Sequence, residues 1–231
     1  MRSTYVMRVW LPDRPGALGA VASRIGAVGG DVVGIDIVER GAGLAVDDLV
    51  VELPSAELLD LLVSEVRQVD GVDVEDLRPV TDALRDPRLD ALETAAVLVG
   101  ATSATELVEA VCEHGARTVG ATWGAVIDLA EESVLSDLGE RPPLAWLVAF
   151  VRGTQASSCG GPVLHADPAA VEVVWAPLPA AGLTLVLGRE GHPFRARERR
   201  QVMALARIVD TRLRQLRAVE ARRGHPSAAG R

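Results

Sequence analysis

The first 80 residues switch between two hydrophobic periodicities, and this switching restricts the fold more than any other feature of the chain. Residues 5–11 alternate in steps of two, as a strand with one buried face does. Residues 15–28 then follow a helical pattern. Proline suits the first turn of a helix, so Pro15 is expected to begin it, and the pair Gly29-Gly30 is expected to end it.

Three further elements complete this first half. Residues 31–39 (DVVGIDIVE) and 44–53 are predicted strands joined by the turn RGAG. Ser55 is the expected N-cap of a second helix with an apolar side, and the segment DGVDVEDLRPV supplies a turn and a fourth strand. The order βαββαβ predicts a ferredoxin-like domain, in which two helices cover one face of an antiparallel sheet.

The second half predicts another sheet with flanking helices. Residues 79–90 are polar and contain two prolines, which indicates a linker or the lead into a helix. A helix is expected over residues 105–119. The expected strands cover residues 123–129, 145–152, 171–175 and 183–188. The longest loop of this half is expected over residues 153–168.

A long helix is expected to close the second half, over residues 196–216. Its apolar residues recur at spacings of four and three: Val202, Ala206, Val209, Leu213 and Leu216. This pattern fits either a coiled-coil-like seam or one broad face laid on the sheet, and both readings stay open. The last residues have little to bury, so a disordered tail is expected over residues 218–231.

Composition excludes several classes of function. The 231-residue chain has a net charge of −8 and a sequence pI near 5.1, which argues against a nucleic-acid partner. The chain lacks a signal-peptide pattern and any run of roughly 20 apolar residues, so we expect a soluble, cytoplasmic protein with no membrane partner.

Cofactor chemistry is also restricted by the residues present. Without lysine, neither a Schiff base nor a P-loop can form. The two cysteines are too few for a disulfide framework, and no pair among the four histidines has metal-ligand spacing. We therefore expect no cofactor, no metal and no catalytic residue. The acidic pair Asp47-Asp48 is interpreted as a solvated loop or strand edge.

The junction between the first strand and the first helix, DRPGAL, is the candidate site. Backbone N–H groups at a helix start are unpaired and favour anions, so those near Gly16, Ala17 and Leu18 can hold a carboxylate. The Asp13 carboxylate can accept hydrogen bonds from an ammonium group. Together these groups describe a site for an α-amino acid. The competing interpretation is that Asp13 or Arg14 merely caps the helix and Pro15 merely starts it.

Asp31 is a further candidate, but it lies at the far end of the first helix. That helix is roughly 20 Å long at about 1.5 Å per residue, so Asp31 is out of reach of Asp13 within one subunit. It could reach the site across a dimer.

The stretch DRPGALGAVASRIGAVGGDVVGIDIVE resembles the start of an ACT domain, a ferredoxin-like module that senses amino acids. The resemblance implies an ACT domain over residues 1–80 that pairs with a second copy. It also implies that Asp13, Gly16, Ala17 and Leu18 of one subunit face Asp31 and Val32 of the other. Ligand-binding members often have asparagine where this chain has Asp13 or Asp31. Two acids near one ammonium could repel each other, or one could stay protonated.

Residues 93–217 resemble a GAF-like domain, through TELVEAVCEHGARTVGATWGAVIDL and the closing strand and helix, with residues 81–92 as a linker or helix lead-in. These resemblances imply an α+β chain that acts as a non-enzymatic regulatory protein: an amino acid binds at an ACT dimer interface, and the GAF-like domain transmits the signal. Two alternatives stay open. One is a dimerising scaffold without ligand, and the other is a small hydrolase that uses the loop containing Ser157 and His165.

Overall fold

The computed structural model describes residues 3–80, 87–157 and 172–223. The chain forms two compact units, and the main boundary between them follows residue 85. Each unit has its own sheet and its own hydrophobic core. We therefore describe the two units separately.

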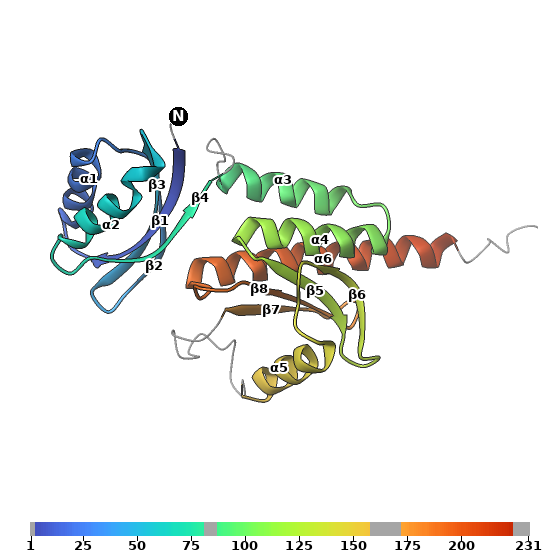
Figure 1. Ribbon diagram of the computed structural model, residues 1–231. Helices are drawn as coiled ribbons and strands as arrows, with labels where there is room; N and C mark the ends of the chain where they lie inside the picture. The colour runs from blue at the N-terminus through green and yellow to red at the C-terminus, as the bar shows by residue number, and fades with distance from the viewer. Residues whose placement is uncertain (1–2, 81–86, 158–171, 224–231) are drawn as a thin grey trace, which may run out of the picture. The chain divides into compact units, whose positions relative to one another are not determined.

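The first unit has the predicted βαββαβ order. Its elements are β1 (Ser3–Pro12), α1 (Ala17–Ala27), β2 (Asp31–Gly41), β3 (Leu44–Leu53), the 3-10 helix η1 (Ala56–Leu58), α2 (Leu59–Arg67) and β4 (Asp73–Pro79). The sheet order is β2-β3-β1-β4, and every pairing is antiparallel. Helices α1 and α2 cover one face of this sheet (Figure 1). The ferredoxin-like prediction is confirmed.

The core of the first unit forms between this face and the two helices. Tyr5, Met7, Val9 and Leu11 are buried there, as the alternation along β1 predicts. The predicted cap at Ser55 is also confirmed, because its hydroxyl accepts a hydrogen bond from the Glu57 N–H at 3.2 Å. It caps η1, which leads directly into α2.

The second unit is a four-stranded antiparallel sheet with helices on both faces. Its elements are α3 (Pro87–Gly100), α4 (Ala104–Val119), β5 (Trp123–Asp128), β6 (Ser133–Leu138), α5 (Leu144–Ser157), β7 (Val173–Leu178), β8 (Leu183–Gly188) and α6 (Ala196–Arg223). The strand order is β6-β5-β8-β7. Helices α4 and α6 pack on one face and α5 on the other (Figure 1). The predicted α+β class, with an antiparallel sheet and flanking helices, is confirmed.

One predicted strand of this unit is wrong. Residues 145–152 belong to helix α5, which begins after two prolines; the Trp146 and Leu147 N–H groups both bond to the Pro143 carbonyl. The run LAWLVAFV is apolar throughout, and a short run of this kind fits a buried strand or a buried helix equally well. The missing strand is β6, whose residues are mostly exposed.

The apolar side of helix α6 packs against the core of its own unit. Val202, Ala206, Val209, Leu213 and Leu216 are all buried in the core of the second unit. The broad-face reading is therefore confirmed, and no apolar seam remains for pairing with a second copy through these residues. The helix continues to Arg223, past the expected end at Leu216. Residues 224–231 of the expected tail lie outside the described residues.

Candidate ligand site at the start of helix α1

Helix α1 begins in an unusual way. Its N-cap is Gly16, whose backbone is left-handed, with φ +88° and ψ −17°. Glycine suits this conformation because it has no Cβ to clash. A Cβ built at Gly16 would meet no heavy atom within 4 Å, so the space beside this backbone is open. A small molecule can approach the helix start there.

No side chain of the described residues caps this helix start. Neither Asp13 nor Arg14 serves as N-cap, and Pro15 precedes the helix, so the interpretation of DRPG as a simple cap is wrong. The Ala17 N–H makes a turn bond to the Arg14 carbonyl at 3.3 Å. The other N–H groups of the first turn have no carbonyl one turn earlier within the helix, and the dipole makes this end electropositive.

Asp13 lies beside the β2–β3 turn. Its N–H donates to the Gly43 carbonyl at 2.9 Å, which fixes the loop against that turn. Its carboxylate is 42% exposed and lies 3.9 Å from the Arg40 Nε. Sequence reasoning missed Arg40, because nothing in the order of residues shows that the end of β2 returns to the start of α1.

Asp47 is the second residue that sequence reasoning missed. It lies on the inner strand β3, opposite Val9 of β1 and Ile37 of β2, and only 4% of its surface is exposed. The interpretation as a solvated loop or strand edge is therefore wrong. The available signal was the phase of the strand: residues 45, 49, 51 and 53 are apolar and buried, and Asp47 occupies the same phase.

The electrostatic surroundings of Asp47 connect it with the helix start. Burial raises the pKa of Asp47 above its ordinary value of 3.8. The Arg40 guanidinium acts against this rise in pKa, and the carboxylates of Asp48 and Asp13 add to it. Among the described residues, nothing forms a hydrogen bond with the Asp47 Oδ1.

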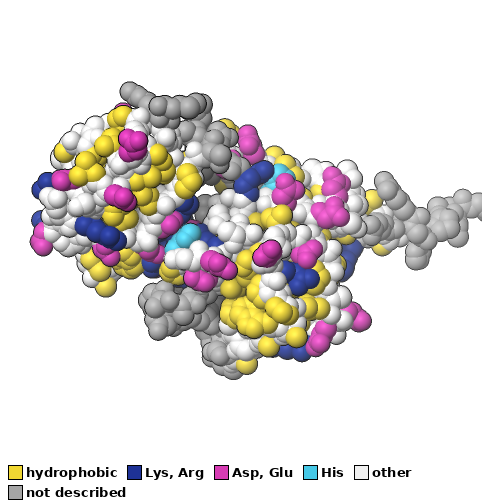
Figure 2. All heavy atoms as spheres, viewed as in Figure 1, with side chains coloured by type: hydrophobic (Ala, Val, Ile, Leu, Met, Phe, Trp, Pro, Cys, Tyr) yellow, Lys and Arg dark blue, Asp and Glu magenta, His cyan; other side chains and the backbone are white. Residues whose placement is uncertain are grey.

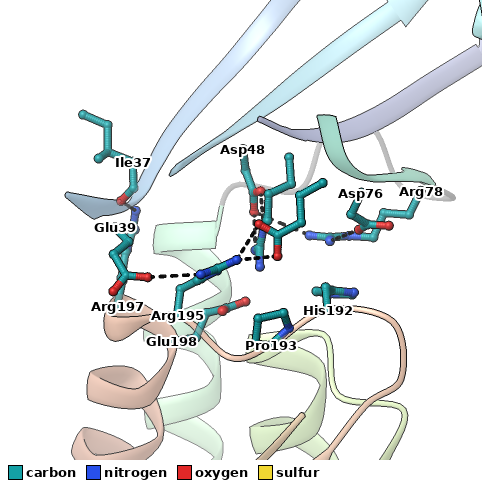
Figure 3. Close-up of polar contacts among 12 residues, drawn as sticks. Ile37, Glu39, Asp48, Asp76, Arg78, His192, Pro193, Arg195, Arg197 and Glu198 are labelled. Atoms are coloured by element: carbon teal, nitrogen blue, oxygen red, sulfur yellow. Dashed lines mark hydrogen bonds and ion pairs between the residues drawn. The ribbon is translucent and has the colours of Figure 1, made fainter. Parts of the chain in front are cut away.

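The neighbouring Asp48 faces the opposite side of β3 and is fully engaged. Its two carboxylate oxygens accept hydrogen bonds from the Arg8 Nε at 2.7 Å and the second Arg8 guanidinium nitrogen at 2.8 Å. Arg78 lies 3.5 Å from Asp48 and also donates to Asp76 at 2.8 Å (Figure 3). Asp48 is therefore part of an ion-pair cluster on the helix-free face of the sheet.

Asp31 and Val32 lie at the other end of the sheet. Asp31 pairs with Glu52, which pairs with Thr4, whereas Asp13 follows Pro12. This offset is roughly eight residues, or about 26 Å at about 3.3 Å per residue. The structure thus brings Asp13, Gly16, Ala17 and Leu18 together and keeps Asp31 and Val32 apart from them within one chain. Strand β2 is an edge of its sheet.

The rest of the described surface adds few chemical signals. None of the described helices has the length and apolar character needed to cross a membrane. In the described ranges, no group of three or more His, Cys, Asp or Glu side chains could hold a metal ion. On the face shown in Figure 2, acidic and basic side chains are interspersed. Cys112 is buried, which raises the pKa of its thiol, and Cys159 and His165 lie outside the described residues.

Fold and site together define the first unit as a ferredoxin-like module with an accessible helix start. Residues 5–71 match the family model of the ACT domain, so the chain carries an ACT domain at its first unit, as the DRPGAL stretch predicts. No curated protein sequence matches the chain.

Three solved structures are similar to parts of the chain or to most of it. The crystal structure of the ACT domain from the GTP pyrophosphokinase of Chlorobium tepidum is 16% identical, with a TM-score of 0.29, over 35% of this chain and 100% of that one. A protein of unknown function from Galdieria sulphuraria is 14% identical, with a TM-score of 0.34, over 96% and 95% of the two chains. A GAF domain from Pseudomonas syringae pv. tomato is 16% identical, with a TM-score of 0.36, over 60% and 92%.

Proposed function

We propose that this chain is a non-enzymatic regulatory protein whose first unit binds a free α-amino acid at the start of α1. One observation carries the proposal: the helix starts at Gly16 with open space in front of it and no side-chain cap, beside the carboxylate of Asp13. The match to the ACT domain supports a regulatory, ligand-sensing role.

The chemistry of an α-amino acid fits these groups. Its carboxylate can accept hydrogen bonds from the N–H groups of the first turn, where the helix dipole favours negative charge. The ammonium group of the amino acid can then donate hydrogen bonds to the carboxylate on the side of Asp13. Arg40, 3.9 Å from Asp13, balances the negative charge of that side while no ligand is bound.

A second copy of the chain completes the site in this proposal. Asp31 and Val32 lie too far from Asp13 to act in the same chain. Strand β2 is an edge strand, and edge strands can pair with another chain. Three of its apolar side chains are well exposed: Val33 at 48%, Ile35 at 50% and Ile37 at 40%. Pairing of two copies along β2 would cover these side chains and place Asp31 of each copy opposite the partner.

Ligand binding at such a joint can regulate the second unit. A ligand that binds one arrangement of the two copies more tightly shifts the population towards that arrangement. The exposed apolar side chains of β2 also favour a second candidate, a scaffold that dimerises without ligand.

Thermal unfolding with each of the twenty common amino acids at millimolar concentration tests the proposal. A ligand at about 100 times its Kd adds roughly 2.7 kcal/mol to the unit that binds it, so one or two amino acids should raise the melting temperature clearly. The substitutions Asp13→Ala and Asp31→Ala should reduce this shift. Asp60→Ala, which removes an exposed acid from α2, is the control and should keep it. A dimer with no shift for any amino acid would favour the scaffold.

A further inference from the structure

Asp47, in the interior of the first unit, is an acid that the described part of the fold leaves incompletely bonded. Asp47 lies in a row of buried apolar residues on β3, with the fully buried Val9 beside it on β1. Its Oδ1 has no hydrogen-bond partner in the described part of the chain. An ionised carboxylate in such surroundings is costly unless something else compensates its charge.

The open side of this region faces strand β2. Ile35 and Ile37 point to the same side of the sheet as Asp47, according to the register with β3, yet they are 50% and 40% exposed. The helices therefore leave the β2 edge of this face uncovered. Asp13 and Arg40, which lie beside the start of α1, are close enough to Asp47 to act on its charge.

The two acids of the site differ in what already compensates them. Asp13 is partly exposed and has the Arg40 guanidinium 3.9 Å away. Asp47 is more deeply buried, and no donor in the described ranges bonds to its Oδ1. A ligand cation therefore replaces more lost solvation at Asp47 than at Asp13, because a buried charge gains most from a new partner.

We propose that Asp47 is the principal acceptor for the ammonium group of the bound amino acid, with Asp13 and Arg40 forming an already paired rim. This inference rests on the proposed function and assigns a specific recognition role within the same site. This role of Asp47 restricts the ligand to molecules with a cationic donor next to their carboxylate. A 2-hydroxy acid of the same shape, which lacks that cation, should bind poorly.

The test compares Asp47→Asn, which keeps the size of the side chain and removes its charge, with Asp13→Asn and the wild-type chain. Each common L-amino acid is titrated by calorimetry and thermal unfolding. For every amino acid that binds, the 2-hydroxy acid with the same side chain is titrated as well. Asp48→Asn is the matched control, because it changes the neighbouring acid on the opposite face of β3.

The expected result is specific to Asp47. Asp47→Asn should weaken amino-acid binding about 10- to 100-fold, the range for losing a hydrogen bond to a charged group, and should remove the preference over the hydroxy acid. Asp13→Asn should weaken binding less. Asp48→Asn should lower the melting temperature but keep the preference.

The outcomes separate this inference from the proposed function. If amino acids bind and Asp31→Ala weakens them while Asp47→Asn keeps both affinity and preference, the role of Asp47 is wrong and the proposed function stands. A larger loss in Asp13→Asn than in Asp47→Asn also overturns the assignment. If no amino acid binds the wild-type chain, both proposals fail together.

Discussion

Two buried charged residues, Arg189 in the second unit and Asp47 in the first, differ in how far the fold supplies them with partners. In the second unit, Arg189 is buried, and its guanidinium donates to both carboxylate oxygens of Glu198 at 2.8 Å. It also donates to the carbonyls of Val119, His192 and Pro193, and it lies 4.0 Å from the centre of the Phe194 ring. In the first unit, Asp47 is comparably buried, but its Oδ1 has no hydrogen-bond partner among the described residues.

The starts of helices α4 and α1 show the same contrast. Helix α4 is capped by Ser103, whose hydroxyl accepts a hydrogen bond from the Glu106 N–H at 3.2 Å. The Glu106 carboxylate accepts two further bonds from Thr102, both at 2.8 Å. This arrangement is a variant of the capping box. Helix α1, by contrast, starts at Gly16 with no side-chain cap.

Buried or terminal polar groups that the chain satisfies internally serve the fold. Those that it leaves open cost stability and persist more readily where a ligand supplies the missing partner. Arg189 and Ser103 belong to the first kind, and Asp47 and Gly16 to the second. The comparison can be tested because removal of the charge should destabilise the protein at Arg189 and stabilise it at Asp47.

The largest effect is expected at Arg189. Arg189→Ala leaves the Glu198 carboxylate and three carbonyls without their donor, so the second unit should lose about 3–5 kcal/mol of stability. Denaturant unfolding followed by tryptophan fluorescence measures this loss, since Trp123, Trp146 and Trp175 lie in the second unit. Arg152→Ala removes an exposed pair with Glu132 and should cost at most about 1 kcal/mol. Equal losses of stability in Arg189→Ala and Arg152→Ala would show that the buried bonds of Arg189 do not stabilise the second unit more than an exposed ion pair does.

Gly16 should show the next largest effect. Gly16→Ala forces a Cβ into the left-handed region and should cost about 1–2 kcal/mol, although no atom stands in the way of the new methyl group. Gly26→Ala is the control within the same helix, where the backbone is helical and the space is also open. It should stabilise the unit by about 0.5–1 kcal/mol. A gain in both variants would show that the conformation at Gly16 is not required.

Asp47→Asn should act in the opposite direction and stabilise the ligand-free protein, by about 1 kcal/mol at neutral pH, because it removes a poorly compensated buried charge. The pKa of Asp47 is raised in the folded state above 3.8, so the penalty is absent at low pH, where the carboxyl is protonated in both states. It grows as the pH rises through the interval between the unfolded and folded pKa values. Unfolding experiments across acidic and neutral pH should therefore show the variant and the wild type converging in acid. If Asp47→Asn were less stable than the wild type, the charge of Asp47 would stabilise the fold, as that of Arg189 does.

The sequence predicted the first unit well because its strands alternate and its helix has clear end signals. Residues 5–11 show the buried face of β1 directly, and DRPGAL marks the region of Gly16. Helix α5 was not predicted because its run of eight apolar residues contains no polar positions whose spacing could distinguish a helix from a strand.

The candidate site was only half predictable, for a geometric reason. Asp13, Gly16, Ala17 and Leu18 are neighbours in the sequence, so local signals suffice to find them. Arg40 and Asp47 join them through the β2–β3 turn and the strand register, and these depend on long-range pairing. The sequence signal for Asp47 was its position in the strand, where the residues two positions apart are apolar and buried. Because Asp47 is an acid, it was instead predicted to be exposed to solvent.

The smallest effect concerns Glu106 and sharpens the contrast between the two helix starts. Hydrogen bonds from the Thr102 N–H and hydroxyl lower the pKa of Glu106 below its ordinary value of 4.5. A lowered folded-state pKa contributes stability above pH 4.5, and this contribution is lost as the pH falls through the folded value. Glu106→Gln should therefore be less stable than the wild type at neutral pH, and the difference should disappear in acid.

Glu109→Gln, one turn further along the exposed side of α4, is the matched control and should show no such convergence. The direction is opposite to that of Asp47→Asn, since a satisfied carboxylate stabilises when ionised and an unsatisfied one destabilises. If both variants shifted the same way with pH, the local bonding of each acid would not determine its effect. If they diverge, the local hydrogen bonding of each acid determines whether its charge stabilises or destabilises the fold.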